Sequence, residues 1–141
     1  MFGGGLIPLS LWIAYQDLKR GKIPNRALLL FSLLVGVQLY LEKNPYPFLY
    51  SGLMGLVLVG GTLCTPFAQK IGAGDLKLFI LSCFCIDIFH FPFFMIMTGS
   101  IGVLWALVYR LMLKQPSFPF GPSLLMGLWA TLLKTYFFLR F

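Results

Sequence analysis

Long apolar segments separated by short polar connections run through almost the whole of this 141-residue sequence. A mean hydropathy of +0.88 and a charged fraction of 11% place the chain outside the range of soluble globular proteins. A membrane helix needs about 20 residues, or fewer where the bilayer thins, so the sequence predicts an all-α, polytopic membrane protein with about six transmembrane helices. No residues are left for a separate soluble domain, and a single transmembrane domain is expected over residues 1–141. The apolar segments cover approximately residues 3–15, 27–41, 48–68, 75–89, 93–113 and, after residues 118–122, the stretch up to 138.

Three short motifs rich in glycine or proline mark expected helix starts. Pro24 and Asn25 stand before the second apolar segment, where proline suits a helix start and asparagine is a good N-cap. Residues 72–74, Gly-Ala-Gly, interrupt the helical pattern, so Asp75 is predicted to lie at a helix N-terminus. Residues 118–122, Phe-Pro-Phe-Gly-Pro, open the last helix.

The lysine and arginine residues gather in alternate connections, which is the pattern that orients membrane proteins. If the connection after the first apolar segment is cytoplasmic, eight of the 11 basic residues lie on that side and three on the other. Both termini then face away from the cytoplasm, and Asp17 and Asp75 lie at its edge. Because the basic residues form no continuous stripe, the net charge of +7 is interpreted as a topology signal, and nucleic acid is not expected as a partner. The larger group is Lys19, Arg20, Lys22, Arg26, Lys70, Lys77, Arg110 and Lys114, and the smaller is Lys43, Lys134 and Arg140.

Asp17 and Asp75 are two of only four acidic residues in the sequence. A carboxylate at mid-membrane costs roughly 2.5–3.5 kcal/mol on insertion scales, so two carboxylates beside apolar segments indicate a function. Peptide hydrolysis by an aspartate pair needs one carboxylate that accepts a proton from water and one protonated carboxyl that donates to the scissile carbonyl. Two carboxyl groups in one site of low dielectric constant share a proton and titrate as a unit. We therefore predict that Asp17 and Asp75 form one aspartyl-peptidase site, in which either could be the base.

Residues around Asp75 fit this chemistry. Gly72 and Gly74 would let the backbone turn sharply and let an extended substrate approach the carboxylate. Lys77 is interpreted either as a contact for a charge or a phosphate headgroup, or as a topology residue beside the membrane. Asp17 is expected in the connection that follows the first apolar segment.

Other functions remain open for the same carboxylates. Asp17 alone could pair with Lys19 or Arg20, and Asp75 alone could be an N-cap. Together they could relay protons or bind a cation in a small transporter, or belong to a non-catalytic assembly partner. A transporter should carry ionisable residues within its apolar segments, whereas the acidic residues here gather at the segment ends. That distribution favours an accessible catalytic site.

Neither a metal nor an organic cofactor is expected. His90 has no second histidine or cysteine at the spacing of metal ligands and is interpreted as a turn residue. The cysteines fall within apolar segments, so we expect core positions for them rather than a disulfide framework or a four-thiolate zinc site. They are Cys64, Cys83 and Cys85.

In its polar motifs the chain resembles the type IV prepilin peptidases, which are membrane aspartyl peptidases of the GxGD type. Asp17 followed by residues 23–25, Ile-Pro-Asn, is similar to the first catalytic segment of that family. Residues 72–78, Gly-Ala-Gly-Asp-Leu-Lys-Leu, are similar to the second, and residues 118–122 are similar to the motif that opens the last helix. The resemblance covers about residues 15–127.

The resemblance implies a six-helix bundle in the bacterial inner membrane, with Asp17 and Asp75 as a catalytic pair that faces the cytoplasm. Its partners would be membrane lipids and prepilin-like precursors, whose short basic leader precedes an apolar helix and is removed on the cytoplasmic side. Full-length bacterial members also carry a cytoplasmic domain with paired Cys-x-x-Cys motifs and methylate the new N-terminus. This chain lacks those cysteines, so it looks most like the short, peptidase-only branch associated with tight-adherence pili, and N-methylation is not expected. The residues expected to bind substrate or shape the site are Gly72, Gly74, Lys77, Pro24, Asn25, Pro119 and Pro122.

Overall fold

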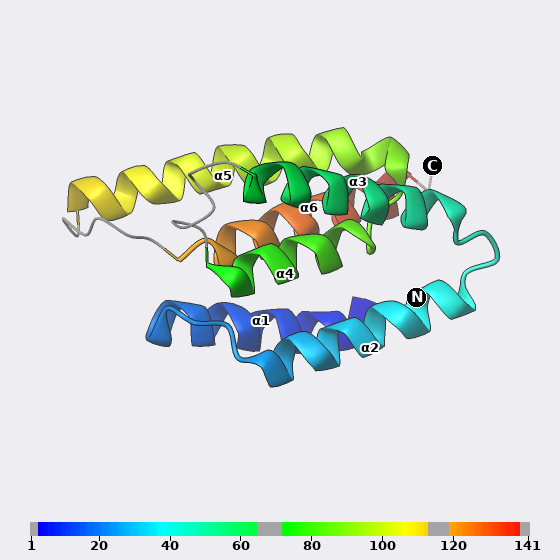
Figure 1. The fold of residues 1–141 in the computed structure, drawn as a ribbon, viewed down its shortest axis with the longest axis horizontal. Coiled ribbons are helices and arrows are strands. Elements are labelled where there is room, and N and C mark those ends of the chain that lie inside the picture. The colour runs from blue at the N-terminus through cyan, green and yellow to red at the C-terminus, as the bar shows by residue number, and fades with distance from the viewer. Residues whose placement is uncertain (1–2, 65–71, 113–118, 139–141) are drawn as a thin grey trace.

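The computed structural model describes residues 3–64, 72–112 and 119–138, and it confirms the all-α class for them (Figure 1). The described residues contain α-helices and one short 3₁₀ turn, η2, and no strand. The α-helices are α1 (Gly3–Arg20), α2 (Asn25–Leu41), α3 (Tyr46–Leu63), α4 (Ala73–Cys83), α5 (Phe91–Met112) and α6 (Gly121–Phe138), and η2 (Ile88–His90) precedes α5.

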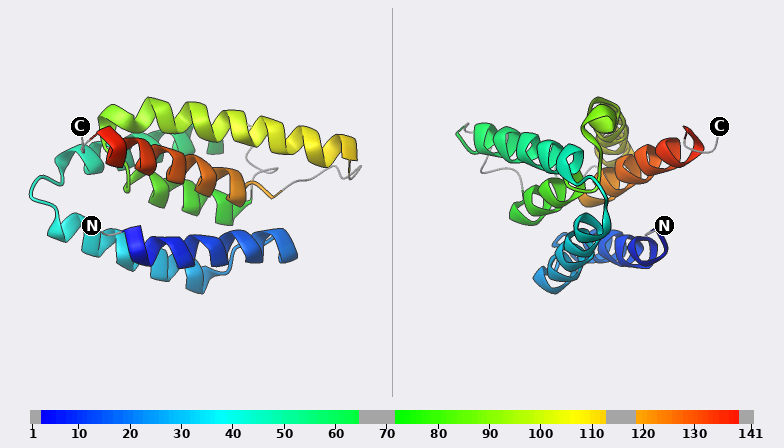
Figure 2. Two further views of the ribbon diagram at one scale, coloured as in Figure 1. Left: turned by 180° about the vertical axis from the view of Figure 1, so that it is seen from behind. Right: turned by 90° about the vertical axis from the view of Figure 1, so that its right-hand side faces the viewer.

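The helices run alternately up and down one elongated bundle (Figure 1). α6 packs against α5, α1 and α4. α3 packs against α4, and α2 packs against both α1 and α4. The two views in Figure 2 show α1 and α2 as a pair beside the group formed by the other helices. This alternation brings the C-terminal ends of α1, α3 and α5 and the N-terminal ends of α2, α4 and α6 to one end of the bundle. We call it the motif end, because the motifs that contain Asp17 and Asp75 lie there.

Two helical segments in the described part of the chain are long and apolar enough to cross a membrane. They are α3 and the segment Ile88–Met112, which contains η2 and α5. α2 is apolar but has 17 residues, and α4 has only 11, well short of the length of a straight span. Length and composition thus support two spans, and the expected total of six stays a prediction.

The expected end of the first helix, near residue 15, was wrong, because α1 continues to Arg20. Residues 16–20, Gln-Asp-Leu-Lys-Arg, are mostly good helix formers, and the two basic side chains in the last turn interact favourably with the helix dipole. The helix then stops at Gly21, whose φ of 59° lies in the left-handed region and whose N–H donates to the Asp17 carbonyl at 2.8 Å. Asp17 therefore lies in the last turns of α1 rather than in a connection.

The helix starts differ in detail from the expectation. Pro24 is the cap residue of α2 and Asn25 its first helical residue, with no side-chain cap, so the asparagine cap was wrong. Gly72 caps α4, and Asp75 lies in its first turn. The predicted position of Asp75 at a helix N-terminus is confirmed, whereas its alternative role as the N-cap is wrong.

α4 also ends earlier than the apolar segment that was expected to reach residue 89. It stops at Cys83, after which the chain turns and the Asp87 carboxylate accepts a hydrogen bond of 3.0 Å from the Phe89 N–H. An aspartate in this arrangement caps the following turn, which is η2. The apolar run hid this break, because hydrophobicity alone does not mark a turn between two buried segments.

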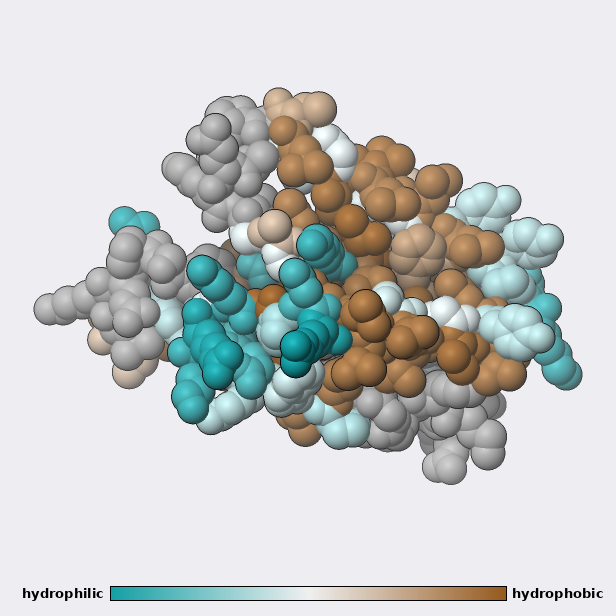
Figure 3. All heavy atoms as spheres, turned by 60° about the horizontal axis from the view of Figure 1, so that its bottom comes forward, coloured by the Kyte–Doolittle hydropathy of each residue, from teal (hydrophilic) through white to brown (hydrophobic). Residues whose placement is uncertain are grey.

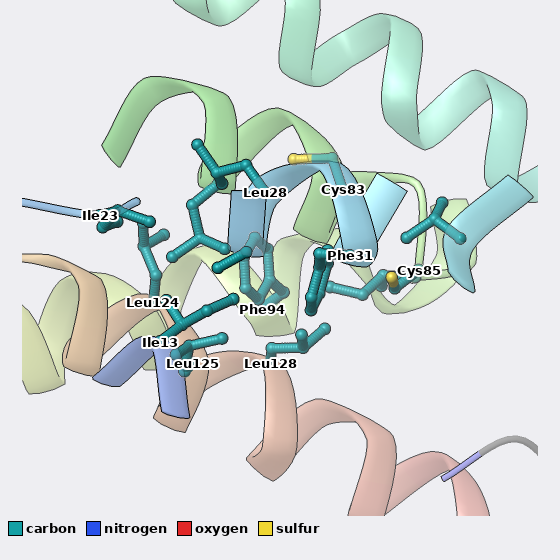
Figure 4. Close-up of a cluster of buried hydrophobic side chains, with 14 of the residues drawn as sticks. Ile13, Ile23, Leu28, Phe31, Cys83, Cys85, Phe94, Leu124, Leu125 and Leu128 are labelled. Carbon is teal, nitrogen blue, oxygen red and sulfur yellow. The ribbon is translucent and has the colours of Figure 1, made fainter. Parts of the chain in front are cut away.

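Side chains from five of the six helices fill the core, together with Ile23 between α1 and α2 and with Cys85 and Ile86 after α4 (Figure 4). Among the cysteines, Cys83 and Cys85 are buried as predicted, but Cys64 is exposed because it follows the last turn of α3. The largest fully buried side chains in the described residues include Phe31, Phe94, Ile13, Leu78, Ile86, Leu124 and Leu128.

Two contacts fix α6 against its neighbours. The Trp129 Nε1–H donates to the Ser10 hydroxyl at 2.9 Å and ties α6 to α1. A Cβ atom at Gly127 would overlap the Thr98 hydroxyl and lie 2.9 Å from Thr98 Cα, so α5 and α6 approach each other at backbone distance. α6 is therefore a rigid support for whatever its N-terminus contacts at the motif end.

Candidate active site

The Asp17 carboxylate is buried at the motif end and is held by another helix. Its side chain is only 3% exposed. Its Oδ2 accepts a hydrogen bond of 3.0 Å from the backbone N–H of Gly121, the first residue of α6. The first N–H groups of a helix have no partner within that helix, and the helix dipole favours negative charge beside them. The contact therefore satisfies a helix end and a buried carboxylate at the same time.

The Asp75 carboxyl group lies in the first turn of α4 and is partly buried. A Cβ atom at Gly72 would lie 3.1 Å from Asp75 Oδ2, so glycine leaves room for the carboxyl group to fold back over the start of the helix. Asp75 also lines a hollow of ≈ 230 Å³ between α3, α4 and α5. The other side chains that line it are apolar apart from Thr62, and they are Leu58, Val59, Leu76, Phe79, Met95 and Phe120.

The two carboxyl groups interact electrostatically, and both lie outside the two helical segments that could cross a membrane. Burial raises the pKa of Asp75 to about 6, and the negative charge of Asp17 adds to the rise. Burial also raises the pKa of Asp17, but the hydrogen bond from Gly121 opposes that rise. In the range around pH 6 the pair can hold one proton, which is the state that acid–base hydrolysis by two carboxyl groups requires.

Ile23 packs between the elements that carry the two carboxyl groups. This buried side chain belongs to the connection between α1 and α2. A Cβ atom at Gly74 would lie 3.2 Å from Ile23 Cβ, and one at Gly121 would lie 3.4 Å from Ile23 Cδ1. Gly74 thus makes room for Ile23, a packing role that differs from the substrate access expected from the sequence. Ile23 was missed as a site residue, although an isolated apolar side chain in a basic connection was the available signal.

The other residues expected at the site lie at the motif end at various depths. Lys77 and Asn25 are exposed, Pro24 and Pro119 are half-buried, and Pro122 is buried in the first turn of α6. Within the described part of the chain, none of them forms a hydrogen bond with either carboxyl group, so their contributions stay predictions.

Exposed basic side chains lie at the motif end, where the carboxyl pair also lies. Figure 3 shows hydrophilic side chains gathered near the end where α1 stops and α2 begins, beside an apolar middle. In the described residues, the Asp17 carboxylate forms no ion pair with these cations; Lys19 instead lies 5.7 Å from the centre of the Tyr15 ring. The described residues also contain no group of three or more His, Cys, Asp or Glu side chains that could hold a metal ion. The exposed cations are Lys19, Arg20, Lys22, Arg26 and Lys77.

These features define a class: an all-helical protein with segments able to cross a membrane and with a pair of interacting carboxyl groups at one end of its bundle. Within that class, the chain belongs to the type IV leader peptidase family, whose sequence profile matches residues 5–107. The protein is therefore a peptidase of the leader-peptidase type, and the matched region contains both Asp17 and Asp75. The motif at 118–122 lies beyond the match. No curated protein and no solved structure matches the chain in the two further comparisons.

Proposed function

We propose that this protein is an aspartyl endopeptidase that removes the short basic leader from prepilin-like precursors. The observation that carries the proposal is the placement of Asp17 and Asp75 at the motif end, close enough for the charge of one to raise the pKa of the other. Burying two interacting carboxyl groups costs free energy, and in a chain with the composition of a membrane protein this cost indicates that the two groups share a function. Membership of the type IV leader peptidase family points to hydrolysis of a leader peptide, and the carboxyl pair can carry out the proton transfers of that hydrolysis.

The proposed reaction needs the pair to hold one proton. The ionised carboxylate takes a proton from water, and the resulting hydroxide attacks the scissile carbonyl carbon while the protonated carboxyl donates its proton to the carbonyl oxygen. In the second step the first carboxyl donates its proton to the leaving nitrogen, the C–N bond breaks, and the second carboxylate recovers its proton from the tetrahedral intermediate. The pair returns to its starting state after one water is consumed.

The surroundings of the pair suit a precursor that combines a leader with an apolar helix. The hollow beside Asp75 offers apolar side chains to the segment that follows the leader. Gly72 leaves room for the Asp75 carboxyl group, and Gly74 leaves room for Ile23. In this proposal the rim of the site is completed by Lys77, Pro24, Asn25, Pro119 and Pro122.

The motif end is proposed to face the cytoplasm from the inner membrane of a bacterium, in a multi-pass arrangement. In the described residues, basic side chains are more numerous at this end than at the other, which is the bias of cytoplasmic connections. The motif end carries Lys19, Arg20, Lys22, Arg26, Lys77 and Arg110, and the opposite half carries Lys43 and Lys134.

Cleavage is proposed to occur without methylation of the new N-terminus, as expected of the peptidase-only branch associated with tight-adherence pili. Only residues 21–24 separate α1 from α2, and the three cysteines of the chain do not form paired Cys-x-x-Cys motifs. An inserted methyltransferase domain therefore has no place between those helices.

Purified protein in proteoliposomes tests the proposal directly. Wild-type protein should cleave a candidate prepilin, and N-terminal sequencing of the product should place the cut at the end of the basic leader. Asp17→Asn and Asp75→Asn should each abolish cleavage, whereas Glu42→Gln, a matched change of an exposed acid at the opposite end, should not. Cleavage at the wild-type rate by either aspartate variant would refute the carboxyl pair. Transfer of a methyl group from S-adenosylmethionine to the product would refute the absence of methylation.

A further inference from the structure

We propose that the backbone N–H of Gly121 is a positioning group that keeps the Asp17 carboxylate ionised and aimed, so that Asp17 is the base and Asp75 the proton donor. The inference rests on the proposed function. It assigns the roles of base and proton donor, which the sequence does not distinguish, to one carboxyl group each. It also assigns a role to a residue that lies outside the region matched by the family.

The two carboxyl groups differ in their hydrogen bonds. Asp17 Oδ2 accepts from the Gly121 N–H at 3.0 Å, at the N-terminal end of an 18-residue helix. Among the described residues, no donor reaches the Asp75 carboxyl group. Each carboxyl group lies beside a helix N-terminus, Asp17 at α6 and Asp75 in the first turn of α4, so the helix dipoles do not separate them. A hydrogen bond to the ionised form favours the carboxylate over the neutral acid, and among the described residues only Asp17 accepts one. The proton shared by the pair therefore resides on Asp75.

The other charged groups near the pair do not reverse this asymmetry. The connection between α1 and α2 and the end of α1 carry cations that are exposed to solvent and form no ion pair with Asp17 in the described residues. α4 contributes Asp75 itself, whose pKa the charge of Asp17 helps to raise, and the exposed Lys77. The described part of α6 contributes no charge before Lys134, near its far end. The cations on the α1 and α2 side are Lys19, Arg20, Lys22 and Arg26.

Glycine at position 121 is what allows the carboxylate to reach the N–H. A Cβ atom there would lie 2.6 Å from Asp17 Oδ2 and 3.2 Å from its Cγ, both shorter than ordinary contacts. Ile23 Cδ1 would lie 3.4 Å from the same Cβ atom, so this side chain closes the space beside the carboxylate. Asp17 itself sits in a helical turn and is 3% exposed, so its carboxylate cannot move far without leaving the hydrogen bond.

The assignment fixes the direction of each proton transfer. Water gives its proton to Asp17 as its oxygen attacks the carbonyl carbon, and Asp75 gives its proton to the carbonyl oxygen. Asp17 then protonates the leaving nitrogen as the C–N bond breaks, and Asp75 takes back a proton from the intermediate. Moving the Asp17 carboxylate should therefore lower kcat more than it weakens substrate binding.

The test compares Gly121→Ala with Gly99→Ala in proteoliposomes that contain a prepilin substrate. A Cβ atom at Gly99 meets nothing within 4 Å, so this variant controls for the addition of a methyl group to a helix. We expect Gly121→Ala to lower kcat about 10- to 100-fold with little change in KM, because a displaced catalytic group costs about that much. The acidic limb of its pH–rate profile should also move to higher pH, because Asp17 then ionises less readily.

A double variant separates positioning from packing. Ile23→Val removes the Cδ1 atom near the new methyl group and leaves the contact with Asp17 unchanged. Adding it to Gly121→Ala should not restore kcat. Restoration of kcat by Ile23→Val, or kinetics of Gly121→Ala equal to those of Gly99→Ala, would overturn the inference while leaving the proposed function intact.

Infrared spectroscopy tests the assignment even if Gly121→Ala does not fold or no substrate is cleaved. In an infrared titration, the C=O stretch of the carboxyl left in Asp17→Asn should persist to higher pH than that of the carboxyl left in Asp75→Asn, because burial alone already raises the pKa of Asp75 and no donor among the described residues holds its ionised form. The opposite pattern would overturn the assignment. Failure of the wild-type protein to cleave any prepilin would count against the proposed function instead, and the infrared result would still decide which carboxyl group holds the proton.

Discussion

Replacing Asp75 by asparagine should stabilise the protein at alkaline pH and leave its stability unchanged at acidic pH. Burial and the charge of Asp17 raise the pKa of Asp75 in the folded protein from its ordinary value of 3.8 to about 6. Below the unfolded value the carboxyl is protonated in both states, so it costs nothing. Between 3.8 and about 6 the unfolded state ionises while the folded state keeps its proton, so the wild-type protein loses stability over this range, and the loss is complete above about 6. Asparagine never ionises and avoids that loss.

The size of the effect follows from the same values. A pKa raised from 3.8 to about 6 corresponds to at most about 3 kcal/mol in the free energy of unfolding. Because Asp75 is only partly buried and solvent screens part of its charge, we expect about half of that value. The gain should be present in full at about pH 8 and mostly absent at about pH 4, since the second value lies near the unfolded pKa.

Thermal unfolding in detergent micelles, followed by circular dichroism, measures the effect at both pH values. Glu42→Gln serves as the control because it removes an exposed carboxylate from the opposite end of the bundle, and it should leave the melting temperature unchanged. An equal stabilisation by Asp75→Asn at both pH values would refute the argument from ionisation. A lower melting temperature of the variant at alkaline pH would refute the conclusion that the folded protein disfavours the ionised form of Asp75.

Three further predictions follow from the structure. The kcat/KM for a prepilin should fall as the pH rises through about 6, because Asp75 then loses the proton it donates; a flat profile over that range would exclude it as the acid. Gly127→Ala should destabilise the protein by about 1–3 kcal/mol in chemical unfolding, because its methyl group meets the α5 backbone, whereas Gly36→Ala faces open space and should be neutral or stabilising. Trp129→Phe should cost about 1 kcal/mol in chemical unfolding through the lost bond to Ser10.

Part of this site could be predicted from local sequence. Gly72 before an apolar run was enough to place Asp75 at a helix start, because a helix boundary depends on neighbouring residues. The bias of basic residues between alternate connections also predicted that Asp17 and Asp75 share one end of the bundle, and the alternating helices confirm it. Both features depend on patterns that repeat within a few residues or from one helix to the next.

The partner of Asp17 could not be predicted, because it is 104 residues away in the sequence. The spacing of apolar residues in α1 and α6 does not indicate which backbone N–H will donate a hydrogen bond to a buried carboxylate. The extension of α1 to Arg20 was missed for a simpler reason. Its last turn is polar, and an apolar segment was taken to end where its apolar residues end, although polar residues with good helix propensity carry a helix further.

The bond between Asp17 and Gly121 also has a consequence for how the protein acquires activity during its synthesis. The ribosome makes Asp17 and Asp75 long before Gly121, so a nascent chain already contains both acids while the donor to Asp17 is still missing. The carboxylate can take its final position only after α6 has begun to fold against α1 and α5. A chain that stops after residue 107 would retain every residue that the family profile matches and still lack this part of the site. Completion of the last helix would thus act as a check that delays proteolysis until the bundle is whole.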